Sequence, residues 1–519
     1  MKTQASRAAL PLLAFVVPLA IYLALPAATV NGDGLRYWKL VLEATWSSMF
    51  LPGHLLYCPL QTLIVDVGTR LLPQVSAVEW MRWLSQMSVA GAVCLVAVTA
   101  KRLGLNLYGQ ALPAFGVAFS YGVWIQAIDI ESYGVALFWV TASIAAMASY
   151  YQRRTVATVV ALGAFNSLAA LFHLAAITLV PASLLLVVLT NAGDRRRTMR
   201  HVCALCVVIF ACFAAPIAAI GFGVLQIDSL GALARWLQGS DHGYHPGFGV
   251  ASVPRALYGV ARNILYLEFF WTASKWLLAL KGAFLLLAGA WFLMQARRVP
   301  GGLASSSKVV LGSVLVFVVL QAALGAYYFG SDTERWVFLT PWIWLVVASV
   351  SSAWPARAQV VVVAVAIVIG AVNLRQGIWP VATDRSIEAR IDALSPLLGE
   401  RSLIISPGGD DWLTWYDLYR PAGAPPEFIR LSELVERHGP NRAALFESLA
   451  LRIGTAQREG RRVLLIGVRD EKTNVRAAPW EYLESLGYPL TGFRTWFDRY
   501  SWDVLQLSDV SQTRVDRLR

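Results

Sequence analysis

The chain has 519 residues, of which 57% are hydrophobic and only 15% are charged, and its mean hydropathy is +0.55. Soluble globular proteins usually carry about 25% charged residues, so this composition excludes an ordinary cytosolic enzyme. The net charge of +12 lies entirely before residue 384, where 25 basic residues accompany 12 acidic ones. Such an excess is typical of cytoplasmic loops that contact anionic lipid, and nothing in it indicates nucleic acid binding.

The apolar residues are grouped into eleven segments that are long enough to cross a hydrocarbon core about 30 Å thick. The sequence therefore predicts an α-helical polytopic membrane protein. The first segment is too long for a signal peptide, so we expect it to be a retained span. The expected spans are residues 8–28, 83–100, 110–127, 133–151, 155–171, 174–190, 202–223, 276–296, 308–329, 336–354 and 358–374.

The segment from Leu55 to Leu72 is also apolar, but Gln61, Asp66 and Arg70 form a polar stripe on a helix. This pattern is typical of an amphipathic helix that lies in the membrane interface. If it does not cross the membrane, the basic groups of the short loops all fall on one side, as expected for the cytoplasmic face of a bacterial inner membrane. These groups are Lys2, Arg7, Lys101, Arg102, Arg153, Arg154, Arg195, Arg196, Arg197, Arg200, Arg297, Arg298 and Arg357.

The opposite, outer face then receives the loops 29–82 and 225–275, the turns 129–131 and 331–335, and the tail. The sequence divides into a membrane domain, residues 1–374, and a tail of residues 375–519 with a different composition. Strand patterns at RSLIIS and RRVLLIGV alternate with helical patterns at PEFIRLSELVERH and AALFESLALRIGTAQREG, and further strands are expected at FRTWFDRY and SWDVLQL. We interpret the tail as an extracytoplasmic three-layer α/β domain.

Charged groups near a bilayer surface carry a free-energy cost unless they pair or face water, so acidic residues in the short outer turns are candidates for function. Asp33 follows the first span between Gly32 and Gly34, which permit a tight turn beside a ligand. The alternative role of Asp33 is to cap the helix expected from Leu35. Both roles remain open from the residues alone.

A second acidic turn on the same face contains Asp129 and Glu131. Two acidic turns with few other charges nearby indicate one shared polar site between helix ends. His173 interrupts a long uncharged stretch, where a histidine is more often a hydrogen-bonded core residue than a functional one.

The motifs GDGLRYW, LPGHLLY, SYGVWIQAIDIESYGVALF, LAALFHLAAITLVPA and SDTERWVFLTP occur in an order that resembles the protein O-mannosyltransferase-like branch of the GT-C glycosyltransferases. These are polytopic enzymes that use a lipid-phosphate-linked sugar. The resemblance covers about residues 8–190 and the Arg335 turn, and it implies a GT-C-like fold. Asp33 lacks the adjacent acidic residue of that branch, and its His-Pro-Pro element is reduced to Leu51-Pro52-Gly53-His54. The residues that match the family pattern are Asp33, His54, Tyr57, Trp124, Glu131, Tyr133 and His173.

The resemblance implies transfer of a sugar from a polyprenyl-phosphate donor to an acceptor hydroxyl of a glycan, lipid or protein. Asp33 is then the expected general base of an inverting reaction, and Glu131 the acid that orients the acceptor or sugar. Arg335 is the expected phosphate ligand because a guanidinium fork matches phosphate oxygens, and an ion pair with Asp332 or Glu334 is its alternative role.

The long outer loop contains His242 and His245 in a glycine-rich stretch that suits a mobile cover over a site. The two histidines also suggest a divalent metal site, although their spacing is a weak signal, and we expect no cofactor.

Two other classes of protein stay open. A secondary transporter should have internal repeats and broken helices with polar groups near the midplane, whereas a non-catalytic scaffold should tolerate loss of Asp33.

Overall fold

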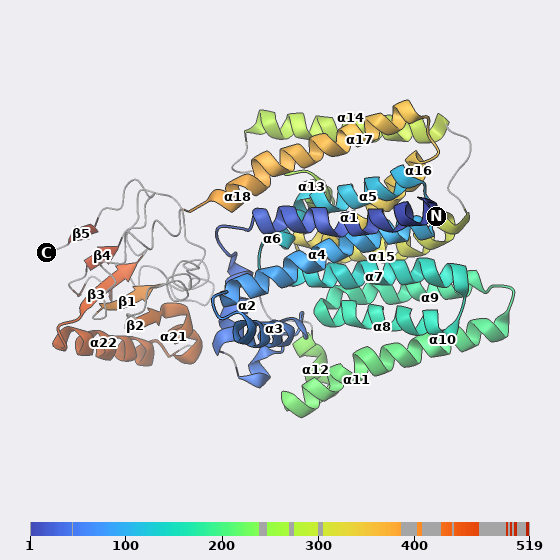
Figure 1. Cartoon of the computed structure of the whole chain (residues 1–519). Helices are drawn as coiled ribbons and strands as arrows, with labels where there is room; N and C mark the ends of the chain where they lie inside the picture. Colours follow the sequence, from blue (N-terminus) through green and yellow to red (C-terminus); the bar gives the residue numbers. More distant parts are fainter. Residues whose placement is uncertain are drawn as a thin grey trace. The chain divides into compact units, whose positions relative to one another are not determined.

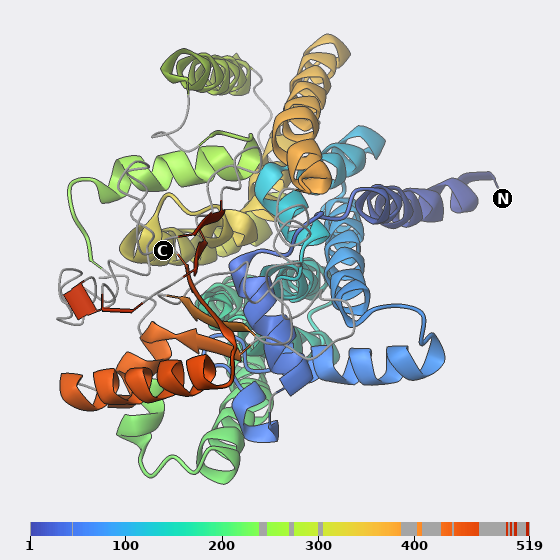
Figure 2. The same ribbon diagram turned by 90° about the vertical axis from the view of Figure 1, so that its left-hand side faces the viewer.

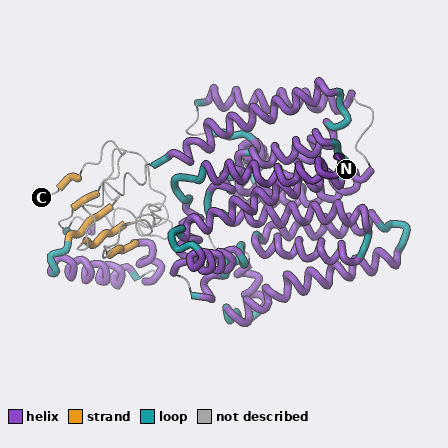
Figure 3. The backbone as a smooth tube through the Cα atoms, viewed as in Figure 1, coloured by secondary structure: helices purple, strands orange, loops and turns teal. Residues whose placement is uncertain are grey.

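The fold is described from a computed structural model of the whole chain. The structure describes residues 2–43, 45–237, 247–268, 274–298, 305–385, 402–406, 427–438, 441–466, 495–496, 499–500, 503–505 and 515–517. The chain divides into two compact units, Met1–Thr383 and Asp384–Arg519. The described part of the first unit is built from helices, whereas the strands belong to the second (Figure 3).

Helices of the first unit run largely side by side in a bundle (Figure 1). Their bounds are α1 Lys2–Ala24, α2 Gly32–Glu43, η1 Trp46–Met49, α3 Tyr57–Leu71, α4 Ala77–Arg102, α5 Leu107–Phe119, α6 Tyr121–Ile128, α7 Ser132–Arg153, α8 Val156–Phe172, η2 Leu174–Thr178, α9 Leu179–Thr190, α10 Arg195–Ile209, η3 Phe210–Ala214, α11 Ala215–Ala218, η4 Ala219–Val224, α12 Leu230–Leu237, α13 Ser252–Ile264, α14 Lys275–Arg298, α15 Ser305–Phe329, η5 Glu334–Leu339, α16 Thr340–Ser351, α17 Ala356–Val372, η6 Asn373–Ile378 and α18 Trp379–Thr383.

Every predicted span falls on helical structure, and the protein is a polytopic α-helical membrane protein. Among the described residues, six helices are long and apolar enough to cross a membrane, and the bent pair α5 and α6 makes a seventh. Three shorter apolar helices, Ala9–Ala24, Val156–Phe172 and Leu174–Thr190, coincide with further predicted spans. The tenth predicted span, 336–354, is divided between η5 and α16.

The predicted span 110–127 falls on two helices and is broken, because the helix axis turns by 61° between α5 and α6. Ser120 at the break has an extended backbone, with φ −66° and ψ 133°. Its hydroxyl donates to the carbonyl of Gly116 at 2.7 Å and accepts from the indole of Trp344 at 2.9 Å. The polar groups at the break are therefore satisfied within the protein.

The predicted interfacial helix is α3, which runs across the direction of α4 and α7 (Figures 1 and 2). It has 15 residues, and Leu63, Val67 and Leu71 on it are exposed. A short helix set across the bundle with an exposed apolar face is the arrangement expected for a segment that lies in the membrane interface.

The bundle has two chemically different ends. We call the end that holds α2, α3, the turn 129–131 and η5 the acidic end, and the end that holds the α4–α5, α7–α8 and α9–α10 connections the basic end. Hydrogen bonds tie the loops within each end. At the acidic end Ala27 donates to the carbonyl of Ile128 at 3.0 Å, and at the basic end Ser306 donates to the carbonyl of Leu103 at 3.3 Å.

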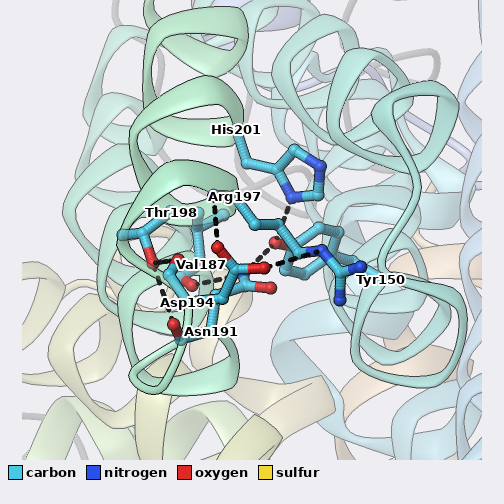
Figure 4. Close-up of polar contacts among 7 residues, drawn as sticks. All are labelled: Tyr150, Val187, Asn191, Asp194, Arg197, Thr198 and His201. Atoms are coloured by element: carbon cyan, nitrogen blue, oxygen red, sulfur yellow. Dashed lines mark hydrogen bonds and ion pairs between the residues drawn. The ribbon is translucent and has the colours of Figure 1, made fainter.

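A polar group of neutral side chains joins α7, α9 and α10 at the basic end (Figure 4). The Tyr150 hydroxyl lies 2.5 Å from the Asn191 amide nitrogen and 2.8 Å from Nδ1 of His201. Asp194, which precedes α10, accepts from the backbone of Arg197 at 2.9 Å and caps that helix. All the charged side chains of this group are exposed, so the bonds between the helices are made by neutral ones.

The described residues of the second unit form a five-stranded sheet in the order β2-β1-β3-β4-β5. Neighbouring strands are parallel except β4 and β5, which are antiparallel. Leu403, Ile405 and Leu465 face a buried core that includes residues of both helices, whereas Ile404 and Leu464 point to the other side and are also fully buried. The elements are β1 Ser402–Ser406, β2 Glu427–Arg430, α21 Leu431–His438, α22 Arg442–Arg458, β3 Arg462–Ile466, β4 Asp503–Leu505 and β5 Val515–Arg517.

Two sequence predictions for this unit are wrong in part. The segment PEFIRLSELVERH is not helical throughout, since Glu427–Arg430 pairs with β1 as strand β2 before α21 begins. A strand over FRTWFDRY is not observed at its described residues, because Thr495 and Trp496 are helical. Trp496 stacks on Phe446 of α22 with ring centroids 5.1 Å apart. The aromatic residues of this segment, which we expected to alternate along a strand, therefore include one that packs on a helix.

Candidate active site

The first outer loop enters the acidic end through a capped helix. The Asn31 side chain accepts a hydrogen bond from the backbone of Gly34 at 2.7 Å, and helix α2 begins at Gly32. Asn31 is therefore the N-cap, and the alternative role of Asp33 as a cap is wrong. Asp33 is an exposed residue of the first helical turn.

Gly34 brings this turn against the second outer loop. A side chain at Gly34 would place its Cβ 2.8 Å from the carbonyl oxygen of Ile130 and 2.5 Å from Val30. Only a glycine permits this approach, which sets the start of α2 directly beside the turn between Asp129 and Glu131. The two acidic turns predicted to share one site are in contact.

Asp129 and Glu131 are both buried at this junction, with exposed fractions of 4% and 0%. Asp129 ends α6 and accepts hydrogen bonds from the backbone of Asn31 at 3.1 Å and of Ile130 at 2.7 Å. Glu131 precedes α7 and accepts from the Asn31 amide through Oε1, whereas its Oε2 has no hydrogen-bond partner among the described residues. One buried carboxylate oxygen is therefore left without a hydrogen bond from the described residues.

Burial changes the acidity of both groups. It raises the pKa of Asp129 to about 6, and the Arg82 guanidinium and two backbone amides oppose that rise. Burial also raises the pKa of Glu131 well above its usual range, and the nearby carboxylates of Glu334, Asp33 and Asp129 raise it further. This part of the molecule therefore disfavours the accumulation of negative charge.

A third segment, the turn before η5, adds two more carboxyl groups. Burial raises the pKa of Glu334 to about 8, and Asp332 and Asp33 add to that rise, while a hydrogen bond to Gln126 opposes it. Asp332 accepts from the backbone of Glu334 at 3.2 Å. Asp33, Glu131 and Glu334 thus come from three distant segments and act on one another electrostatically.

Arg335 is a cation beside these carboxyl groups. Its Nη1 donates to the hydroxyl of Tyr133 at 3.1 Å. The positive charge of Arg335 also opposes the rise that burial causes in the pKa of Asp332 and Glu334, so Arg335 interacts with the acidic residues of its own turn as well. The predicted phosphate ligand and Tyr133 are brought together.

Histidine and tyrosine rings form a wall next to Arg335. The His173 ring centroid lies 4.8 Å from that of His54 and 4.5 Å from that of Tyr133. His54 contacts the carbonyl of Phe172 at 3.3 Å, and burial lowers the pKa of His54 to about 4. His54 is therefore neutral at pH 7. His173 is 6% exposed, and its Nε2 has no hydrogen-bond partner within the described ranges.

The remaining predicted site residues have different positions. Tyr57 is fully buried, lies 4.8 Å from the Tyr37 ring and accepts from Gln61 at 2.9 Å. The Trp124 ring packs against Phe119 at 5.1 Å and Tyr22 at 6.4 Å, so it belongs to the helix core and not to the ring wall. His242 and His245 lie outside the described residues.

No group of three or more His, Cys, Asp or Glu side chains in the described ranges is arranged to hold a metal ion.

Residues that the sequence analysis did not select also help to build the site. Asn31 joins the loops, and Glu334 and Gln126 add a half-buried carboxyl group and its amide partner. An asparagine just before Gly-Asp-Gly is a typical helix N-cap and was a usable signal, whereas nothing local distinguishes Gln126.

The arrangement provides an exposed carboxylate next to buried carboxyl groups, a guanidinium and neutral rings. An exposed carboxylate can accept a proton from a hydroxyl, and a guanidinium can balance the negative charge that develops on a phosphate.

No protein-family model and no curated protein sequence matches this chain. Among solved structures, the chain is similar to ArnT from Cupriavidus metallidurans bound to undecaprenyl phosphate, with 12% identity and a TM-score of 0.49 over 81% of this chain and 84% of that one. The apo structure of the same ArnT gives 13% identity and a TM-score of 0.39 over 80% and 85% of the two chains. At identities this low, no functional role of an ArnT residue can be assigned to a residue of this chain.

Proposed function

We propose that this protein is a membrane glycosyltransferase of the GT-C type that transfers a sugar from a polyprenyl-phosphate donor to an acceptor hydroxyl. The observation that carries the proposal is the convergence of Asp33, Glu131 and Arg335 from three segments at one end of a membrane bundle. Buried carboxyl groups carry a free-energy cost, so their grouping beside a cation favours a functional site over a structural one.

The chemistry assigns one role to each group. The acceptor hydroxyl loses its proton to the Asp33 carboxylate as its oxygen attacks the anomeric carbon. The bond between that carbon and the phosphate oxygen breaks, and its electron pair leaves with the polyprenyl phosphate. Arg335 balances the charge on the departing phosphate. A single displacement of this kind inverts the anomeric configuration, and Glu131 orients the acceptor or the sugar through its free oxygen.

The proposed site lies on the outer face of a bacterial inner membrane, since the basic residues of the short loops gather at the opposite end of the bundle. The C-terminal domain is proposed to be on the same outer side. Single cysteines at positions 101 and 335, labelled in intact cells with a membrane-impermeant reagent, test this orientation. We expect labelling at 335 alone, and labelling of both from one side contradicts it.

A transporter is the second candidate because α5 and α6 form a broken span. The polar groups at that break, Ser120 and Trp344, bond to protein atoms, and the carboxyl groups lie at the bundle end. These positions favour the transferase. Proteoliposomes that move a solute without any lipid donor support the transporter instead.

The direct experiment uses purified protein in nanodiscs with a panel of polyprenyl-phosphate sugars and glycan, lipid or peptide acceptors. Release of polyprenyl phosphate together with a new glycoside supports the proposal and identifies the sugar. Free undecaprenyl phosphate should inhibit as a product analogue. Failure of every donor to be consumed by folded protein contradicts the proposal.

A further inference from the structure

Asn31 is the residue that connects the proposed catalytic base to the buried carboxyl groups. Its side-chain oxygen caps α2 through Gly34 at 2.7 Å, its backbone amide donates to Asp129 at 3.1 Å, and its side-chain nitrogen donates to Glu131. One residue therefore binds the helix that carries Asp33 and both acids of the second loop.

These bonds set the position of Asp33 because that residue lies two positions after Asn31, in the first turn of the helix that Asn31 caps. The close approach of Gly34 to the Ile130 carbonyl holds the same turn from its other side. A shift of the Asn31 side chain must therefore move the Asp33 carboxylate relative to Glu131.

The amide of Asn31 also acts on the charge of Glu131. A hydrogen bond donated to a carboxylate favours its ionised form, and an asparagine amide donates at every pH. Acidic groups that interact electrostatically with Glu131 come from four segments among the described residues, and each disfavours negative charge on Glu131 once it is ionised. These groups are Asp33 and Tyr37 of α2, Tyr57 of α3, Asp129 and Tyr133 around the second turn, and Glu334 of η5.

We propose that Asn31 is a positioning residue of the transfer reaction, which holds the Asp33 carboxylate in a fixed position relative to Glu131 through its bonds to both loops. This inference rests on the glycosyltransferase function proposed above. It assigns to Asn31 a role that acts through two other residues and does not require contact with the substrate.

The discriminating variant is Asn31→Asp, since aspartate caps a helix about as well as asparagine but cannot donate to Glu131. We expect kcat to fall by about 10-fold to 100-fold near pH 7, the size of effect that a displaced catalytic group produces. The loss of the donor and the added carboxylate both raise the pKa of Glu131. The acid limb of the kcat profile should therefore move to higher pH, with activity partly recovered there.

Asn106 offers a matched control, because it caps α5 at the basic end by accepting from Gly109 at 2.8 Å and contacts none of these acids. Asn106→Asp should leave kcat and its pH profile within about 2-fold of the wild type, the scatter expected when no catalytic contact changes. If Asn31→Asp lowers kcat equally at every pH, or behaves like Asn106→Asp, the positioning role is overturned.

A second measurement needs no substrate. Thermal unfolding of Asn31→Ala, Glu131→Gln and the double variant forms a cycle, and we expect the changes in Tm to be non-additive because the two side chains share a bond. Additive changes overturn the positioning role even if the enzyme is active. Non-additive changes in a protein that consumes no donor support the contact and reject the glycosyltransferase function alone.

Discussion

The two ends of the helix bundle use polar residues in opposite ways. At the basic end, neutral side chains such as Tyr150 and Asn191 are buried and join helices, and the charged residues Asp194 and Arg197 beside them are exposed. At the acidic end, Asp129 and Glu131 are buried. Burying charge is unfavourable unless other interactions offset it, so a fold that needs only stability is expected to resemble the basic end. The difference supports the proposed reaction site at the acidic end.

The largest effect is expected at the exposed member of the acidic end. Asp33→Asn removes the proposed base while keeping the size of the side chain, and we expect kcat to fall by about 10² to 10⁴-fold, the usual contribution of general base catalysis. Since Asn31 caps α2, the Tm should stay near that of the wild type. Initial rates of polyprenyl phosphate release and thermal unfolding measure both quantities. If the Asp33→Asn protein is fully active, Asp33 is not the base, and the difference between the two ends does not mark a reaction site.

A smaller effect is expected on donor binding. Arg335→Ala should weaken the apparent affinity for the donor by about 1.5 to 3 kcal/mol, the range of a lost charge-assisted hydrogen bond. Arg335→Lys should lose less donor affinity, because lysine keeps the positive charge but cannot make the two parallel hydrogen bonds of a guanidinium group. Donor titrations at fixed acceptor measure these shifts, and Arg357→Ala, an exposed arginine at the start of α17, serves as the control. Equal affinities for Arg335→Ala and the control exclude the phosphate role.

At the basic end we expect loss of stability without loss of activity. Tyr150→Phe removes the hydroxyl that lies between Asn191 and His201 and leaves buried polar atoms unpaired. The free energy of unfolding should fall by about 1 to 3 kcal/mol. Thermal unfolding and donor turnover, measured on the same preparation, test this separation. A large fall in kcat with an unchanged Tm indicates that this end also takes part in the reaction.

The smallest effect concerns pH. The Glu334 carboxyl titrates near 4.5 when unfolded and at about 8 when folded. Between these values the folded protein keeps a proton that the unfolded chain has lost, so this group makes stability decline as the pH rises toward 8. Glu334→Gln removes that contribution, and its Tm should fall less between pH 5 and pH 8 than that of the wild type, by on the order of 1 °C. An equal decline in both proteins shows that Glu334 ionises freely.

Much of this arrangement was readable from the sequence, for physical reasons that differ between regions. The spans and α3 follow from local hydropathy, and the pairing of the 33 and 129–131 turns follows from the alternation of spans. The bend at Ser120 did not follow, because it depends on Trp344, which is distant in the chain. Asn31 was accessible as a cap, but its bond to Glu131 depends on two loops meeting. Strand β2 did not follow from the sequence, because its residues fit a helical pattern and adopt a strand only by pairing with β1.

The most direct test of the central claim is the anomeric configuration of the product formed from a donor of known configuration, determined by NMR. Asp33 acting as a base in one displacement predicts that every product molecule carries the inverted configuration. A retained configuration requires two displacements through a covalent sugar intermediate, and that result contradicts the role given to Asp33 and the use of the acidic end described here.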